Sequence, residues 1–206
     1  MTLLVVSAAV GALLFGVTGL LASRLAGAWY GDRVSEDDGP PVLALPEWIF
    51  IAVPAALGAA VGARSVEPPE AALLLVAVLA LTVCAVTDSL TGTIPDLFTL
   101  GPLIAVLALS AVRREWMPLL GAAFAFVPFA LIALLSRGRG MGWGDVKLVA
   151  FGGAIVGLGG ITLAVVIASA AASLAAVLQG RARRPIAYGP YLAASIAAVL
   201  GLGNPV

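Results

Sequence analysis

The chain contains no histidine and a single cysteine, Cys84, so several kinds of catalytic and metal site are excluded from it. A zinc site of cysteine and histidine, a Ser-His-Asp triad and an internal disulfide all require residues that are missing. Cys84 lies in an apolar run, where a buried and inert thiol is the better interpretation. Chemistry must therefore come from carboxylates, hydroxyls or lysine, and we expect no cofactor and no metal.

Charged residues are scarce as well. They make up 11% of the 206 residues, whereas soluble chains contain about 25%. Hydrophobic residues make up 62% of the chain, and the mean hydropathy is +1.12. This composition predicts an integral membrane protein in contact with the lipid bilayer. Lys plus Arg equals Asp plus Glu at 11 each, so the net charge indicates no nucleic-acid partner.

Long apolar runs predict an all-α polytopic membrane protein with about eight transmembrane helices, within a range of six to eight. The expected spans cover about 3–23, 47–63, 70–87, 96–112, 117–135, 145–158, 160–178 and 187–203. The sixth span is short, and glycines obscure its boundary with the seventh. We interpret the first run as a retained helix rather than a signal peptide, because Arg24 follows the run instead of preceding it.

The basic residues predict how the chain is oriented in the membrane. If the N-terminus lies outside, eight of the 11 Lys and Arg residues fall in cytoplasmic loops and three on the opposite side. This distribution follows the positive-inside bias. We therefore expect both termini outside the cytoplasm, with segments 24–46, 88–96, 136–147 and 179–187 in the cytoplasm.

Three acids lie at the ends of predicted spans, whereas the other acids lie in or beside loops. Asp88 ends the third span, Asp96 opens the fourth and Asp145 opens the sixth. Ionisable groups at membrane depth are costly and therefore suggest function. Asp96 follows Pro95 and is most simply a cap of the next helix. Asp88 instead lies where the helix dipole disfavours an anion, which points to a partner or a function.

Asp145 belongs to a glycine-rich stretch, Gly140-Met141-Gly142-Trp143-Gly144-Asp145-Val146-Lys147. On its own, this stretch is equally compatible with a flexible loop that ends in a helix-capping acid. If the helices of Asp88 and Asp145 pack together, however, two carboxyl groups meet in a poorly solvated place, one protonated and one ionised. Such a pair can activate water and protonate a leaving amine, which is the chemistry of aspartic proteases.

Three segments, in this order, resemble the motifs of one family. They are Asp88 through Ile94-Pro95-Asp96, then Gly142-Trp143-Gly144-Asp145-Val146-Lys147-Leu148, and finally Pro185-Ile186-Ala187-Tyr188-Gly189-Pro190-Tyr191-Leu192. They are similar to the first aspartate segment, the GxGD-x-K signature and the Pro-x-x-x-Gly-Pro stretch of type IV prepilin leader peptidases, which are GxGD-type membrane aspartic endopeptidases. The resemblance covers roughly residues 70–200.

The resemblance implies a peptidase that removes the basic leader of prepilins or pseudopilins at the cytoplasmic face of the bacterial cytoplasmic membrane. It implies that Asp88 and Asp145 are the catalytic pair. The other motif positions, expected near the substrate, are Gly142, Gly144, Lys147, Pro95 and Asp96. Asp96 matches a position where the family accepts Asn, so its charge is not expected to be catalytic. Lys147 is either an interfacial lysine or a residue near the leader or the acids.

The N-terminal part departs from the family's pattern. Many larger relatives carry a methyltransferase region with two Cys-x-x-Cys pairs that bind zinc, but segment 24–46 has no cysteine. Within a single membrane domain over 1–206, we therefore expect a reduced N-terminal part at 1–69 and a peptidase core at 70–206. This departure puts N-methyltransferase activity in doubt.

Two other classes of function use the same residues differently. A small proton-coupled transporter would use the two aspartates as a proton relay. Against it, no inverted repeat is evident, and both acids are expected near one face rather than at the midplane. A catalytically inactive scaffold subunit is disfavoured by the intact motifs. The sequence identifies neither the substrate pilin nor the oligomeric state.

Overall fold

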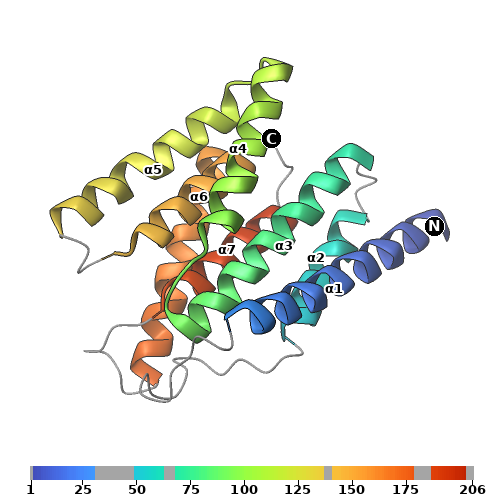
Figure 1. Cartoon of the computed structure of the whole chain (residues 1–206). Helices are drawn as coiled ribbons and strands as arrows, with labels where there is room; N and C mark the ends of the chain where they lie inside the picture. Colours follow the sequence, from blue (N-terminus) through green and yellow to red (C-terminus); the bar gives the residue numbers. More distant parts are fainter. Residues whose placement is uncertain (1, 31–48, 63–67, 137–140, 179–186, 203–206) are drawn as a thin grey trace.

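The computed structural model describes residues 2–30, 49–62, 68–136, 141–178 and 187–202 (Figure 1). In these ranges the chain forms seven helices and no strand, so the predicted all-α class is confirmed. The helices are α1 (Thr2–Tyr30), α2 (Ile49–Gly62), α3 (Pro68–Thr91), α4 (Asp96–Arg113), α5 (Met117–Leu135), α6 (Trp143–Leu178) and α7 (Gly189–Leu202). Most of the expected 24–46 and 179–187 loops lies outside the described residues, as do Gly140, Pro185 and Ile186.

Most of the described helices have the length and the surface of membrane helices. Five of them, α1, α3, α4, α5 and α6, contain apolar stretches of at least 18 residues, and α7 is apolar but has 14 residues. Large apolar side chains such as Phe124, Leu131 and Leu134 are exposed on α5, a surface that suits contact with equally apolar lipid tails. The chain is a multi-pass membrane protein.

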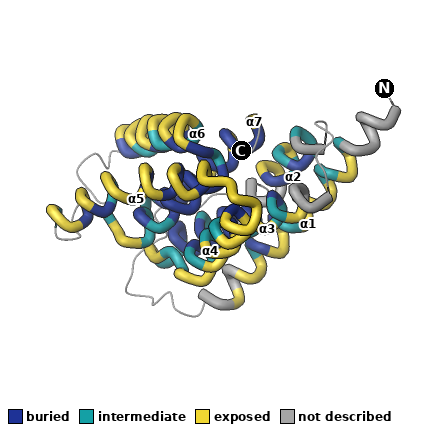
Figure 2. Tube along the Cα trace, turned by 90° about the horizontal axis from the view of Figure 1, so that it is seen from above, coloured by how far each residue is buried: buried dark blue, intermediate teal, exposed yellow. Residues whose placement is uncertain are grey.

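The centre of the bundle is formed by α3, α6 and α7. Most of the largest fully buried side chains come from these helices, among them Val78 on α3, Phe151 on α6 and Leu192 on α7. α1 and α2 pack together beside α3, α5 packs along α6, and α4 contacts both α3 and α6. Buried residues gather toward the middle of the bundle and exposed ones on its outer faces (Figure 2). Cys84 is completely buried in α3, in agreement with the expected burial of its thiol.

Helix α6 turns back on itself at Gly157. This residue has φ 70° and ψ −178°, a combination that is open essentially only to glycine. A Cβ atom at Gly152 would lie 2.9 Å from Ile161 Cδ1, although these positions would be about 13 Å apart along a straight helix. α6 therefore consists of two helices, 143–156 and 158–178, packed against each other. They correspond to the expected spans 145–158 and 160–178.

We expect Gly157→Ala to destabilise the fold, because a Cβ atom is strained at this backbone conformation. The free energy of unfolding in detergent should fall by about 1–3 kcal/mol, measured by denaturant titration of helical circular dichroism. Gly159→Ala is the matched control, since nothing lies within 4 Å of a Cβ atom at that position. Equal stability of the two variants would contradict the strained turn.

Candidate active site

Asp88 lies in the last turn of α3, because this helix continues to Thr91 and not only to the expected end at 87. Only 6% of the residue is exposed. The backbone N–H of Gly189 donates a hydrogen bond to Asp88 Oδ2 at 3.0 Å. Gly189 is the first residue of α7, and the free N–H groups at a helix N-terminus favour an anion. The position of Asp88 at a helix C-terminus predicts a partner that stabilises its charge, and the N-terminus of α7 is such a partner.

Glycine at position 189 permits this close contact. A Cβ atom there would lie 2.6 Å from Asp88 Oδ2 and 3.0 Å from Ile94 Cδ1. Ile94 also packs against the start of α6, where a Cβ atom at Gly144 would lie 2.9 Å from Ile94 Cβ. One residue from each of the three motif segments thus meets in one place: Ile94, Gly144 and Gly189. The prediction did not include Ile94 among the site residues.

Asp145 lies in the first turn of α6, where the helix dipole favours its negative charge. The backbone N–H of Gly142 interacts with its carboxylate, which also interacts electrostatically with Asp88. Asp145 Oδ1 is buried and has no hydrogen-bond partner among the described residues. Because an unpaired buried acceptor costs about 1–3 kcal/mol, this oxygen is suited to bind a reacting group. The structure thus brings the two predicted acids together.

Tyr188 connects the start of α7 to the second half of α6. Its hydroxyl group hydrogen-bonds to Ser169 Oγ at 3.1 Å and donates to the Val165 carbonyl at 3.5 Å. It also interacts electrostatically with Asp145. Two consecutive residues therefore interact with the two acids, Gly189 through a hydrogen bond to Asp88 and Tyr188 electrostatically with Asp145. The Gly-Pro motif was the only sequence signal for these contacts, and the motif did not specify what the residues would touch.

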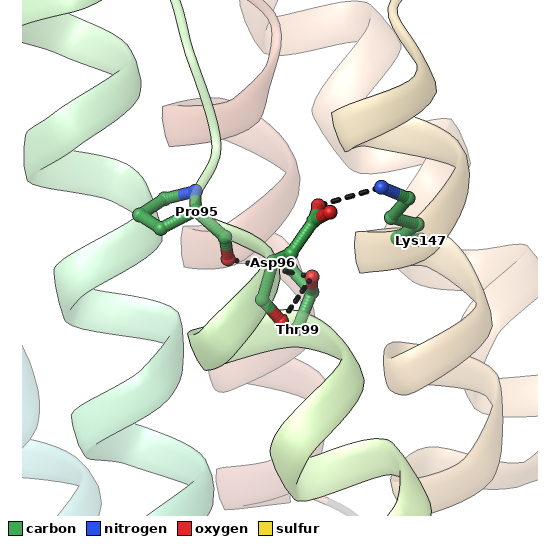
Figure 3. A network of polar contacts seen from close by, with 4 residues as sticks. All are labelled: Pro95, Asp96, Thr99 and Lys147. Carbon is green, nitrogen blue, oxygen red and sulfur yellow. Dashed lines mark hydrogen bonds and ion pairs between the residues drawn. The ribbon is translucent and has the colours of Figure 1, made fainter.

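Asp96 and Lys147 form an ion pair (Figure 3). Lys147 Nζ donates to Asp96 Oδ1 at 2.6 Å, which joins the start of α4 to the start of α6. Pro95 is the N-cap residue of α4, and no side chain caps this helix. The expectation that Asp96 caps α4 is therefore wrong for its side chain, although the acid does lie in the first turn. The Thr99 hydroxyl bonds the carbonyls of Pro95 and Asp96.

All seven predicted site residues lie at helix ends on one end of the bundle. They are Asp88 in the last turn of α3, Pro95 and Asp96 at the start of α4, and Gly142, Gly144, Asp145 and Lys147 at the start of α6. The described part of the chain holds no group of three acidic or cysteine side chains that could bind a metal ion. Two neighbouring carboxyl groups with a buried oxygen free to accept a hydrogen bond can bind and activate water.

Fold and site define a class, a polytopic membrane protein with two acids set together at one end of a helical bundle. Residues 75–177, half of the chain, match the type IV leader peptidase family. The chain belongs to this family, so the predicted membership is confirmed.

Relatives with known names are similar over much of this chain. The prepilin leader peptidase/N-methyltransferase of Burkholderia pseudomallei strain K96243 is 35% identical over 160 residues, which cover 71% of this chain and 52% of the relative. The protein of the same name from Bacillus subtilis strain 168 is 37% identical over 150 residues, which cover 69% of this chain and 60% of the relative. The chain thus spans little more than half the length of these relatives. No solved structure is significantly similar to it.

Proposed function

We propose that this protein is an aspartic endopeptidase that removes the basic leader of a type IV prepilin or pseudopilin at the cytoplasmic membrane face. The observation that carries the proposal is the pairing of Asp88 and Asp145, which come from two separate motifs and interact beside the start of α7. Both relatives named above are prepilin leader peptidases. Cleavage of a purified prepilin by the reconstituted protein, compared with its Asp145→Asn variant, tests the proposal.

The pair provides the proton transfers that peptide hydrolysis needs. The ionised acid takes a proton from a water molecule as the water oxygen attacks the scissile carbonyl carbon. The protonated acid hydrogen-bonds the developing oxyanion and then gives its proton to the leaving amine when the C–N bond breaks. The Gly189 N–H holds Asp88 in place during these steps, and the unpaired Asp145 Oδ1 offers an acceptor for water or substrate.

An apolar groove next to Asp88 provides room for the apolar segment of the substrate. The groove opens between α2, α3 and α7. Its lining includes Ala85, one turn before Asp88, and Pro190, which follows Gly189. The Thr82 hydroxyl in its wall donates to a carbonyl of its own helix, which leaves the wall apolar. A substrate segment in this groove would extend from the two acids along the membrane helices.

Filling the groove should weaken substrate binding. Ala194 lines the groove and is exposed, so Ala194→Phe should raise the KM for prepilin roughly tenfold, the size expected when apolar contacts are lost. kcat should change little, because the two acids are not touched. Ala198→Phe is the control, since Ala198 is exposed on the same helix but does not line the groove. Equal KM values in the two variants would contradict this docking site.

The placement of the protein in the cell completes the proposal. We place it in the bacterial cytoplasmic membrane with about eight crossings and both termini outside the cytoplasm, as the charge distribution indicates. The two halves of α6 support the higher number of crossings. The family match begins at residue 75, which supports a peptidase core at 70–206, and we assign 1–69 to a reduced N-terminal part whose N-methyltransferase activity is in doubt.

The proton-coupled transporter remains the alternative class. A proton relay needs acids along a path through the membrane, whereas Asp88 and Asp145 lie together at one end of the bundle. Proton uptake by proteoliposomes without prepilin cleavage would favour the transporter.

A further inference from the structure

The Asp96–Lys147 ion pair is too exposed to contribute much to the stability of the fold. The two atoms are 2.6 Å apart, but 62% of the Asp96 side chain and 25% of the Lys147 side chain are exposed to solvent. Ion pairs in such surroundings stabilise a protein only slightly, because water and salt screen them. Lys147 can therefore be replaced at Asp96 by another cation at little cost.

The pair lies at the same end of the bundle as the proposed active site. Asp96 follows Ile94 by two residues, and Ile94 packs against Gly144 and Gly189. Lys147 follows Asp145 by two residues in the first turns of α6. Of the described acids at this end of the bundle, Asp88 is buried and Asp145 is partly buried, whereas Asp96 is exposed. Asp96 is therefore the carboxylate that a cation arriving from water meets here.

We propose that Asp96 binds a basic residue of the substrate's leader and that Lys147 occupies this carboxylate until the substrate replaces it. The inference rests on the proposed function, which supplies a positively charged leader next to the scissile bond. The negative charge of Asp96 is complementary to the positive charge of the leader. Lys147 has the same sign as the leader and repels it until the leader takes its place at Asp96. The ion pair thus selects for substrates that carry a basic residue at the right distance from the scissile bond.

Two single substitutions distinguish this exchange from a structural ion pair. Asp96→Asn should raise the KM for prepilin about fivefold, the effect of losing one exposed charge pair. Lys147→Gln should lower KM, because it leaves Asp96 free for the leader. kcat should be unchanged in both variants, since Asp88 and Asp145 remain in place. If the ion pair only stabilised the packing of α4 against α6, both substitutions would impair cleavage of prepilin. That result would overturn the proposal.

Two further measurements complete the test. With a prepilin whose leader Lys and Arg residues are changed to Gln, the KM difference between wild type and Asp96→Asn should disappear. The double variant Asp96→Lys/Lys147→Asp restores an ion pair but should still raise KM, because the new Lys repels the leader. A wild-type KM in the double variant would mean that the ion pair only stabilises the contact between α4 and α6. Failure of the wild type to cleave any prepilin would instead refute the proposed function.

Discussion

Replacement of Asp145 by Asn should reduce prepilin cleavage by at least about 10³-fold, and Asp88→Asn should have the same effect. Each acid has to move a proton during hydrolysis, and a positioned acid or base typically contributes about 10²- to 10⁴-fold to the rate. Asn keeps the shape of the side chain but cannot transfer the proton. The measurement is the initial rate of leader release from purified prepilin in proteoliposomes, followed by mass spectrometry.

The control for this experiment is Glu115→Gln, which removes a negative charge at the opposite end of α4. The Ser110 hydroxyl bonds the backbone carbonyl of Glu115 and not its carboxylate, so this substitution should leave both the fold and the cleavage rate unchanged. Equal amounts of folded protein should be verified by size-exclusion chromatography in detergent. Full cleavage activity in either aspartate variant would refute the assignment of the pair.

Gly189→Ala should lower kcat by roughly 100-fold, because a displacement of a catalytic group by about 1 Å can reduce the rate that much. The new Cβ atom would lie 2.6 Å from Asp88 Oδ2 and 2.9 Å from Asp88 Cγ, and the carboxyl group must move away. KM should change much less than kcat, because the groove and the Asp96 carboxylate are unaffected. The measurement is the full dependence of the cleavage rate on prepilin concentration.

A second glycine provides the comparison for this prediction. Nothing lies within 4 Å of a Cβ atom at Gly101 in α4, so Gly101→Ala should cleave prepilin like the wild type. The unfolding temperatures of both variants show whether a general loss of stability explains the result. A wild-type kcat in Gly189→Ala would mean that the start of α7 does not position Asp88.

The sequence predicted the all-helical class of the fold more completely than the contacts between its segments. Apolar runs predicted the all-α class, whereas the glycines around the reversal of α6 obscured the boundary between the sixth and seventh predicted spans. The end of α3 was predicted four residues too early, because its last turn contains Asp88, Ser89 and Thr91, which are polar. The hydroxyl groups of Ser89 and Thr91 bond carbonyls of the preceding turn, so these residues continue the helix despite their polarity.

The contacts between distant segments could not be predicted from local pattern. The dipole argument predicted that Asp88 needs a partner, but the donor is Gly189, 101 residues away. Likewise, Lys147 was predicted to be either an interfacial lysine or a residue near the leader or the acids, while its partner Asp96 is 51 residues away. Both contacts depend on how α3, α4, α6 and α7 pack. That packing is set by the whole apolar core, which no single motif encodes.

The contact between Gly189 and Asp88 has a consequence for the biogenesis of the protein. Helices α3 and α6, which carry the two acids, leave the ribosome and enter the membrane before α7 is made. Until α7 packs between them, Asp88 lacks its N–H donor and Asp145 lacks Tyr188 as a neighbour. If the two acids are the proposed catalytic pair, the site that they form is complete only after α7 has inserted, at a late step of membrane insertion.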